Sequence, residues 1–286
     1  MSIGCIYALV ALGFVLIYKA TEVVNFAQGE LLMLGAFFAY TFITLFGWNY
    51  WIGAAAAIGC MFFMGNLVDR VVLRPVLGQP QFAIVMVTIG FGYVARSVAG
   101  MVPGWGTETY AIETPFSSEG MQIIPESMGT LVIAQTDLSV IVATILFCIV
   151  LYLFFTYTKL GVAMQASSQN QLASYYMGIP VKSVFSMIWG ISAAVAAAAG
   201  ILLAPTTLID ANMGFIGLKA FPAAVLGGFG SIPGAVVGGI IIGIIETLSG
   251  FYLPPGVKNV AAYVVLLVVL VVRPQGLFGE KTGKRV

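Results

Sequence analysis

The feature that most constrains the fold is a series of long apolar runs, among them 52–68, 137–158 and 183–204. A helix needs about 20 predominantly apolar residues to cross a bilayer, whereas a spanning strand shows about 10 residues of alternating polarity. Only helices and closed barrels satisfy all of their backbone hydrogen bonds in lipid. Because the runs are continuous rather than alternating, the sequence predicts an all-α polytopic membrane protein.

The composition agrees with this fold class and excludes several functions. The chain is 60% hydrophobic and 8% charged, whereas soluble domains contain about 25% charged residues. Its net charge of +1 argues against a nucleic-acid partner. It contains no histidine, which removes histidine proton relays, histidine metal ligands and Ser-His triads. We therefore predict no catalytic residues and no metal site, and we read three cysteines in apolar runs as buried thiols: Cys5, Cys60 and Cys148.

A polar segment, 159–182, separates two of the apolar runs. It is bracketed by lysines and contains no acidic residue, so the positive-inside bias predicts a cytoplasmic location. One interpretation is a solvated loop. The other is a short helix on the membrane surface, with an apolar side at 172–177 and a stop at Gly178 and Pro180, that docks on a cytoplasmic partner.

Counting segments from this cytoplasmic anchor predicts about eight membrane-crossing elements, some of them broken, in a single transmembrane domain over 1–286. The segment 103–136 contains Glu108, Glu113, Glu119 and Glu126 without any lysine or arginine, and is expected to be an external loop. The count places the first residues outside. It also requires 218–250 to dip into the membrane and return as two half-length helices that meet near Gly230.

Two interruptions in the apolar pattern are candidate solute sites. Asn25, Gln28, Gly29 and Glu30 follow one another between short apolar runs, which indicates a discontinuous helix whose unwound backbone could bind a polar solute. An intramembrane carboxylate is costly and therefore suggests function. The alternative is that these residues cap a helix at the membrane edge, with the carboxylate near the positive helix end.

The second interruption is rich in glycine. Its small-xxx-small steps, 234–238 and 239–243, favour close helix packing. Gly228, Gly230 and Ser231 are candidates for shaping a solute cavity or gate, and close helix packing is the alternative role for the glycines. Glu246 is expected near the outer surface, where snorkelling or capping is as good an explanation as solute contact.

Three motifs carry a resemblance to a known family. VNFAQGE at 24–30, VLGGFGSIPG at 225–234 and RPQG at 273–276 together resemble the permease subunits of bacterial branched-chain amino-acid ABC importers. The resemblance extends over essentially the whole chain. It implies a non-enzymatic translocation subunit in the bacterial cytoplasmic (inner) membrane, which moves branched-chain or related hydrophobic amino acids inward.

The same resemblance implies that 159–182 couples this chain to an ATPase. The general importer pattern E-A-A-x-x-x-G falls on Leu172, Ala173, Ser174 and Gly178, of which only Ala173 and Gly178 agree. The residues expected to take part in coupling are Gln165, Ser168, Leu172, Ala173, Ser174, Gly178 and Ile179. The chain has no G-x-x-x-x-G-K-[ST] motif, which fits ATP and Mg²⁺ held by a partner and no cofactor on this chain. The implied partners are a second homologous permease, ABC ATPase subunits, an external solute-binding protein and the lipid bilayer.

Other functions remain open at this stage. Members of the same family are associated with urea, short amides and aromatic acids. An ion-coupled secondary transporter would also use broken helices, and its activity would survive ATP depletion while an ion gradient is maintained. A membrane enzyme ranks last because no nucleophile–base pair stands at useful spacing, and no selectivity segment indicates a channel.

Overall fold

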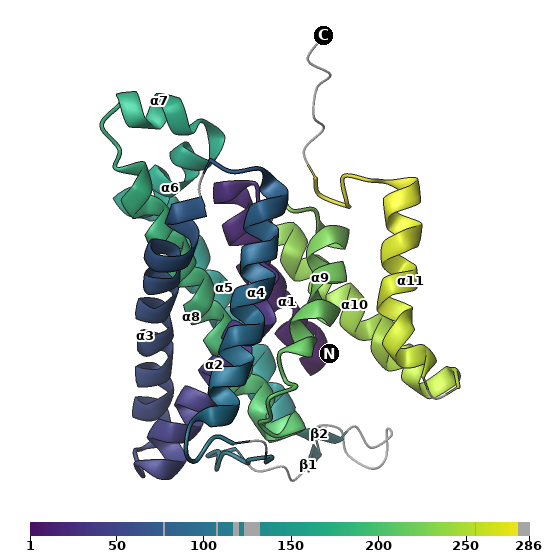
Figure 1. Cartoon of the computed structure of the whole chain (residues 1–286). Coiled ribbons are helices and arrows are strands. Elements are labelled where there is room, and N and C mark those ends of the chain that lie inside the picture. The colour runs from purple at the N-terminus through teal and green to yellow at the C-terminus, as the bar shows by residue number, and fades with distance from the viewer. Residues whose placement is uncertain (77, 107, 117–119, 123–131, 255, 280–286) are drawn as a thin grey trace.

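The computed structural model describes residues 1–76, 78–106, 108–116, 120–122, 132–254 and 256–279, which form a helical bundle (Figure 1). Glu119 and Glu126 of the expected external loop, and residues 280–286, lie outside the described residues. The elements are α1 (Ser2–Thr21), α2 (Gln28–Tyr40), η1 (Thr41–Leu45), α3 (Tyr50–Val68), η2 (Asp69–Leu73), η3 (Arg74–Val76), α4 (Gln81–Met101), β1 (Gly120–Gln122), β2 (Val132–Ala134), α5 (Gln135–Tyr157), α6 (Lys159–Gln169), α7 (Gln171–Tyr176), α8 (Val181–Thr207), α9 (Phe215–Gly227), α10 (Ile232–Tyr252) and α11 (Val257–Val272).

The all-α membrane class is confirmed. Among the described residues, 7 helices are long and apolar enough to cross a membrane. They are α1, α2 continued by η1, α3 continued by η2 and η3, α4, α5, α8 and α10. The shorter apolar helices α9 and α11 complete the bundle.

The core of the bundle is built by α1, α2 and α8. Alanines of α8, including Ala193 and Ala197, are fully buried, and small side chains let helix backbones approach closely. Gly35 of α2 packs against Ala197, and Gly200 of α8 packs against the carbonyl of Leu32. By contrast, α3, α4 and α5 carry many exposed apolar side chains on their outer faces.

The two ends of the bundle differ in charge. Figure 1 shows α6, α7 and the end of α11 at one end, and β1 and β2 at the opposite end. Segments at the first end carry the cations Arg70, Arg74, Lys159, Lys182 and Arg273, whereas loops at the opposite end carry Glu108, Glu113 and Asp210. The positive-inside bias therefore places α6 and α7 on the cytoplasmic side. The helix α1 runs toward that side, in the predicted direction.

The prediction of two half-length helices over 218–250 is only half right. α9 is short, with 13 residues, but α10 has 21 residues and is long enough to cross the membrane. Pro233 lies in the first turn of α10, where its missing N–H costs nothing. Gly238 packs against the carbonyl of Ala223, and Gly239 packs against Ala8 of α1. The glycines of α10 therefore serve helix packing, which is the interpretation that the spacing favoured.

The external loop has some local structure. β1 and β2 pair in antiparallel fashion, with Met121 opposite Ile133. Tyr110 exchanges backbone hydrogen bonds of 2.9 and 2.8 Å with Ile209. This bridge ties the segment after α4 to the segment before α9.

Candidate functional site

The predicted break at 25–30 separates α1 from α2. Glu22 ends α1 in the left-handed conformation, with φ of 56°, and α2 begins at Gln28. Between them, Asn25 Oδ1 accepts a hydrogen bond of 3.0 Å from the backbone N–H of Ala27. The discontinuous helix is thus present, and its second half begins at a buried residue, Gln28.

Two amide side chains of this break are completely buried. Asn25 Nδ2 donates to Gln28 Oε1 at 3.3 Å, and Gln28 Nε2 donates to the carbonyl of Ser192 at 3.4 Å. The Ser192 hydroxyl in turn lies 3.0 Å from the carbonyl of Gly13. These contacts join α1, α2 and α8, so the buried side chains of Asn25 and Gln28 stabilise the backbone at the break.

The N-terminal ends of α2 and α9 meet through glycines. A Cβ atom built on Gly29 would overlap the carbonyl oxygen of Gly214, and one built on Gly217 would overlap the backbone of Gly29. Only glycine, which has a hydrogen atom in place of Cβ, fits at this crossing. Because the N-terminal ends of helices carry partial positive charge, the junction favours a nearby anion.

That anion is Glu30, which forms an ion pair with an arginine of α4. Arg96 Nη2 lies 2.7 Å from Glu30 Oε1, and the guanidinium carbon lies 4.2 Å from the centroid of the Phe215 ring. The side chains of Arg96 and Glu30 are 18% and 13% exposed. Sequence reasoning missed Arg96, although an arginine inside an apolar run is itself a signal.

A second ion pair joins α9 to α10 and α1. Lys219 Nζ lies 3.4 Å from Glu246 Oε1, and the Tyr7 hydroxyl donates to Glu246 Oε2 at 2.5 Å. Glu246 is only 4% exposed. Partners on α1 and α9 thus hold its carboxylate inside the bundle, and its expected position near the outer surface stays a prediction.

The remaining predicted pathway residues lie in the turn between α9 and α10, at the cytoplasmic end of α9 (Figure 1). Gly228 has φ of 94°, and Ser231 caps α10 by accepting a hydrogen bond of 3.1 Å from the N–H of Gly234. A Cβ atom on Gly230 would meet no described atom within 4 Å. The helices meet instead at Gly227 and Gly234, so Gly230 is not the point of close approach.

The turn is covered by the residues that follow α11. Leu277 donates its N–H to the carbonyl of Leu226 at 2.8 Å, and Phe278 donates to the carbonyl of Gly227 at 3.1 Å. A Cβ atom on Gly276, whose φ is 77°, would lie 2.6 Å from the carbonyl oxygen of Val225. Two motifs far apart in the sequence, 225–234 and 273–276, thus form one structural unit, which we call the C-terminal clamp (residues 225–228 and 275–279).

Gly276→Ala is expected to loosen the C-terminal clamp. The left-handed conformation alone costs a non-glycine residue about 1–2 kcal/mol, and the overlap with the Val225 carbonyl adds to that. Hydrogen exchange should become faster at the amides of Leu277 and Phe278. Gly100→Ala, which places a methyl group in open space on α4, is the control. Unchanged protection in Gly276→Ala would show that the clamp does not depend on this glycine.

The segment 159–182 forms α6 and α7 rather than an open loop. The predicted short helix is α7, whereas α6 was not predicted. Asn170 caps α7 by accepting a hydrogen bond of 2.9 Å from the N–H of Ala173. Gly178, with φ of 83°, ends α7 as expected, and the N–H of Ile179 donates to the carbonyl of Ser174 at 3.0 Å.

The predicted coupling residues fall into two groups. Ser174 is buried, whereas Leu172 and Ala173 are exposed on α7. The exposed apolar side chains of α7 and its end form a ridge, which we call the α7 ridge: Leu172, Tyr175, Tyr176 and Met177. Met177 is 82% exposed. An apolar ridge of this kind suits contact with another protein.

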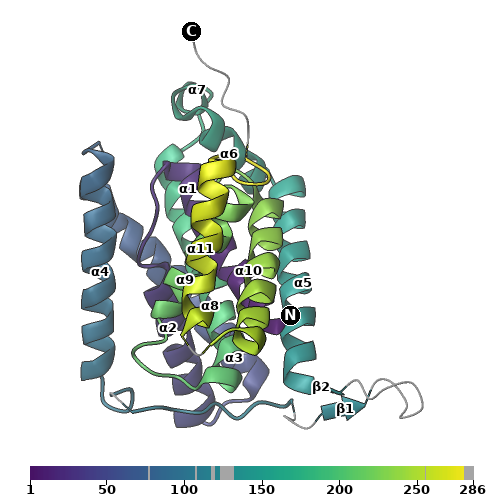
Figure 2. The same cartoon turned by 90° about the vertical axis from the view of Figure 1, so that its right-hand side faces the viewer.

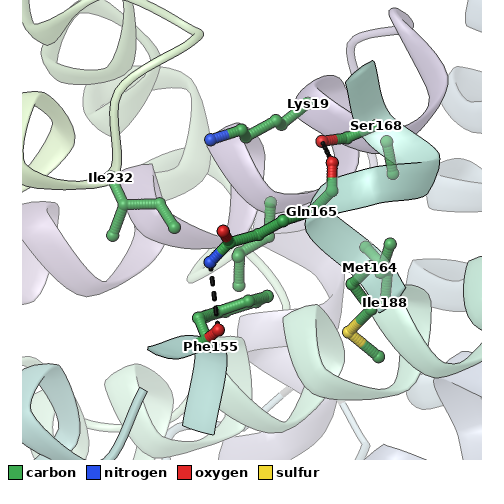
Figure 3. Close-up of a pocket in the computed structure, with 9 residues that line it drawn as sticks. Lys19, Phe155, Met164, Gln165, Ser168, Ile188 and Ile232 are labelled. Atoms are coloured by element: carbon green, nitrogen blue, oxygen red, sulfur yellow. Dashed lines mark hydrogen bonds between the residues drawn. The ribbon is translucent and has the colours of Figure 1, made fainter. Parts of the chain in front are cut away.

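The second group lines a small pocket under α6. Figure 3 shows Gln165 and Ser168 facing Lys19 of α1 and Ile232 of α10. Gln165 Nε2 donates to the carbonyl of Phe155 at 3.0 Å, and the Ser168 hydroxyl donates to the carbonyl of Gln165 at 2.8 Å. The pocket therefore brings α6 next to the turn that joins α9 and α10.

Comparison with known proteins gives a consistent result. A family model described as "Branched-chain amino acid transport system / permease component" matches residues 1–272. The high-affinity branched-chain amino acid transport system permease protein LivH of Escherichia coli (strain K12) is 31% identical over 299 residues, covering 100% of this chain and 95% of that protein. BraD, the corresponding permease of Pseudomonas aeruginosa, is 30% identical over 297 residues, with the same coverage of 100% and 95%.

A more distant similarity is partial. The galactofuranose transporter permease protein YtfT of Escherichia coli (strain K12) is 32% identical over 170 residues, which cover 55% of this chain. No solved structure matches the chain.

Proposed function

Because this chain belongs to the branched-chain amino acid transport permease family, we propose that it is the membrane-spanning subunit of an ABC importer. It moves an apolar amino acid inward while partner subunits hydrolyse ATP. The proposed partners are a second homologous permease, ABC ATPase subunits and an external solute-binding protein, assembled in the cytoplasmic membrane. ATP and Mg²⁺ belong to the ATPase subunits, since the sequence lacks a P-loop.

The observation that carries this proposal is the position of α6 and α7. They lie at the cytoplasmic end of the bundle (Figures 1 and 2), and the side chains of the α7 ridge are exposed there. Below them, the pocket of Gln165 and Ser168 adjoins Ile232, directly after the turn that ends α9. The other end of α9 carries Phe215 beside Arg96. The helix α9 thus lies between the pocket under α6 and the pair of Arg96 and Glu30, and it would carry a movement of the α7 ridge from one to the other.

The amino-acid solute rests on the family and on the chemistry of the bundle interior. The charged groups near the start of α9 occur as matched pairs, Arg96 with Glu30 and Lys219 with Glu246. Such neutral pairs suit a zwitterion. Urea, short amides and aromatic acids remain alternative solutes of the same importer class, and uptake assays with each would separate them.

The first test is affinity purification of this chain from its native membrane, followed by mass spectrometry. A P-loop ATPase and a second permease in the purified complex are the expected result. Isolation of the chain alone, or only with copies of itself, would contradict the importer and favour an ion-coupled secondary transporter. Uptake that persists after ATP depletion would point the same way.

Met177→Glu is expected to reduce the recovery of ATPase subunits with this chain by about tenfold. The substitution places a charge on the most exposed side chain of the α7 ridge, where it would be desolvated on docking. Gln169→Glu adds the same charge to an exposed position at the end of α6 and is the matched control. Co-purification quantified by mass spectrometry measures the effect. Equal recovery from both variants would remove the α7 ridge from the docking surface.

A further inference from the structure

We propose that Arg96 and Glu30 form a transient binding site for the zwitterionic head of the solute, with Arg96 receiving the carboxylate and Glu30 the ammonium group. This inference rests on the proposed function, since it assigns residues to the passage of an amino acid. The site lies where α4, the start of α2 and the start of α9 come together.

The first argument is that the pair can be reached from outside the single chain. Arg96 and Glu30 retain 18% and 13% exposure inside an otherwise apolar region. Charged side chains within a membrane are costly where they face lipid, and they normally face a partner or a water-filled cavity. α4 packs mainly on α2 and η2, and it stands apart from α11 in Figure 2. The pair is therefore placed at the edge of the bundle, where a pathway shared with a second subunit would run.

The second argument is that the hydrogen-bonding capacity of Arg96 is only partly used. A guanidinium has five N–H donors in a fork that matches a carboxylate. Nη2 contacts Glu30, whereas Nε is buried and has no hydrogen-bond partner in the described part of the chain. A second carboxylate could engage this donor. An orphaned buried N–H next to a partly exposed ion pair indicates that a ligand completes the site.

The third argument is electrostatic. The N-terminal ends of α2 and α9 meet beside Glu30 through Gly29 and Gly214, and their partial positive charges stabilise an added anion. The ammonium group of the solute would then take the place of Arg96 beside Glu30. Because a zwitterion is neutral overall, the site keeps its charge balance when the solute enters and when it leaves.

The surroundings also offer a place for an apolar side chain. Phe215 and Leu218 lie on the accessible side of α9 and are 48% and 41% exposed. The Phe215 ring is already stacked under the Arg96 guanidinium. A solute whose charged groups engage Arg96 and Glu30 would lay its hydrocarbon chain along this face of α9. The chemistry favours an apolar α-amino acid over a neutral amide, because the amide would offer Arg96 and Glu30 neutral hydrogen bonds in place of charge-assisted ones.

The test uses the complete importer in proteoliposomes, with ATPase subunits and binding protein, and measures leucine uptake and ATP hydrolysis together. Arg96→Gln is expected to lower leucine uptake per ATP hydrolysed by about tenfold or more, since losing one charge-assisted hydrogen bond changes affinity by roughly that factor. ATP hydrolysis stimulated by the binding protein should stay within about twofold of the wild type. Arg96→Lys keeps the charge but not the forked arrangement of N–H donors. Its leucine uptake per ATP hydrolysed should lie between the values for the wild type and for Arg96→Gln.

Two further variants separate solute binding from a structural role. Arg70→Gln removes an exposed arginine at the cytoplasmic end and should leave the uptake-to-ATP ratio unchanged. The double variant Glu30→Gln with Arg96→Gln replaces the ion pair by two amides that can hydrogen bond to each other. If the pair only fastens α4, the double variant should recover uptake, and the proposal is overturned. Continued loss of uptake in a correctly assembled double variant supports the site.

Leucine uptake by the wild-type complex tests the proposed function separately from the binding site. A wild-type complex without ATP-dependent leucine uptake would contradict the amino-acid importer itself. Normal wild-type uptake together with a normal uptake-to-ATP ratio in Arg96→Gln would overturn only the assignment of Arg96 and Glu30.

Discussion

Gly29→Ala is expected to prevent most of the protein from reaching a folded, monodisperse state. The added methyl group would overlap the carbonyl oxygen of Gly214 and would lie 3.1 Å from the Cα atom of Gly217. Both are backbone atoms, so no side chain can move aside, and α2 and α9 would have to separate. Overpacking of an interior costs about 1–3 kcal/mol, and more where backbone must shift. Size-exclusion chromatography and thermal unfolding in detergent would measure the loss.

Gly59→Ala is the matched control for this experiment. Gly59 lies within α3, and a Cβ atom there meets no described atom within 4 Å. Alanine is a better helix former than glycine by about 0.8–1.0 kcal/mol in soluble hosts, so this variant should be at least as stable as the wild type. If Gly29→Ala behaved like Gly59→Ala, the close crossing of α2 and α9 would be wrong.

The second large effect is expected at the ion pair between Lys219 and Glu246. Lys219→Met would leave the buried carboxylate of Glu246 with the hydrogen bond from the Tyr7 hydroxyl but without its cation. Removing one partner of a buried pair costs about 3–5 kcal/mol, because the other charge stays uncompensated. Glu246→Leu should cost less, since the side chain of Lys219 is 31% exposed and can reach a more polar environment. The melting temperature in detergent would rank the two variants.

The double variant Lys219→Met with Glu246→Leu should recover much of the stability lost in Lys219→Met. Replacing both charges by apolar groups of similar size leaves no unpaired ion, and such replacements are often neutral. A double-mutant cycle gives the coupling between the two positions. If the losses from the single variants simply added, the two side chains would not act as a pair.

Much of the fold could be predicted from the sequence because single segments encode it. Apolar runs of about 20 residues identify the spanning helices, and the positions of lysines and acidic residues orient them. The break at Asn25 and Glu30 was visible for the same reason, since polar residues that follow one another cannot continue an apolar helix in lipid. Gly178 marked the end of α7 through its local conformation alone.

The features that were not predicted from the sequence depend on contacts between segments far apart in the chain. Arg96 lies 66 residues from Glu30, and Glu246 lies 239 residues from Tyr7. A single sequence does not show which helices are neighbours, so neither pair was predicted. Glycine is ambiguous for a related reason. It permits a break and it permits close packing, and only the neighbouring backbone shows that Gly227 and Gly234 touch while Gly230 is open.

The C-terminal clamp also sets an order of events during synthesis of the chain. A chain is synthesised from its N-terminus at about 5–20 residues per second, so Leu277 emerges seconds after Leu226, its hydrogen-bonding partner. Until then, the carbonyls of Leu226 and Gly227 and the backbone around Gly228 lack this cover. The turn that adjoins α6 therefore acquires its final shape only when α11 has been made and the residues after it have folded back. Assembly with the proposed cytoplasmic partners at this end would thereby be tied to completion of the last helix.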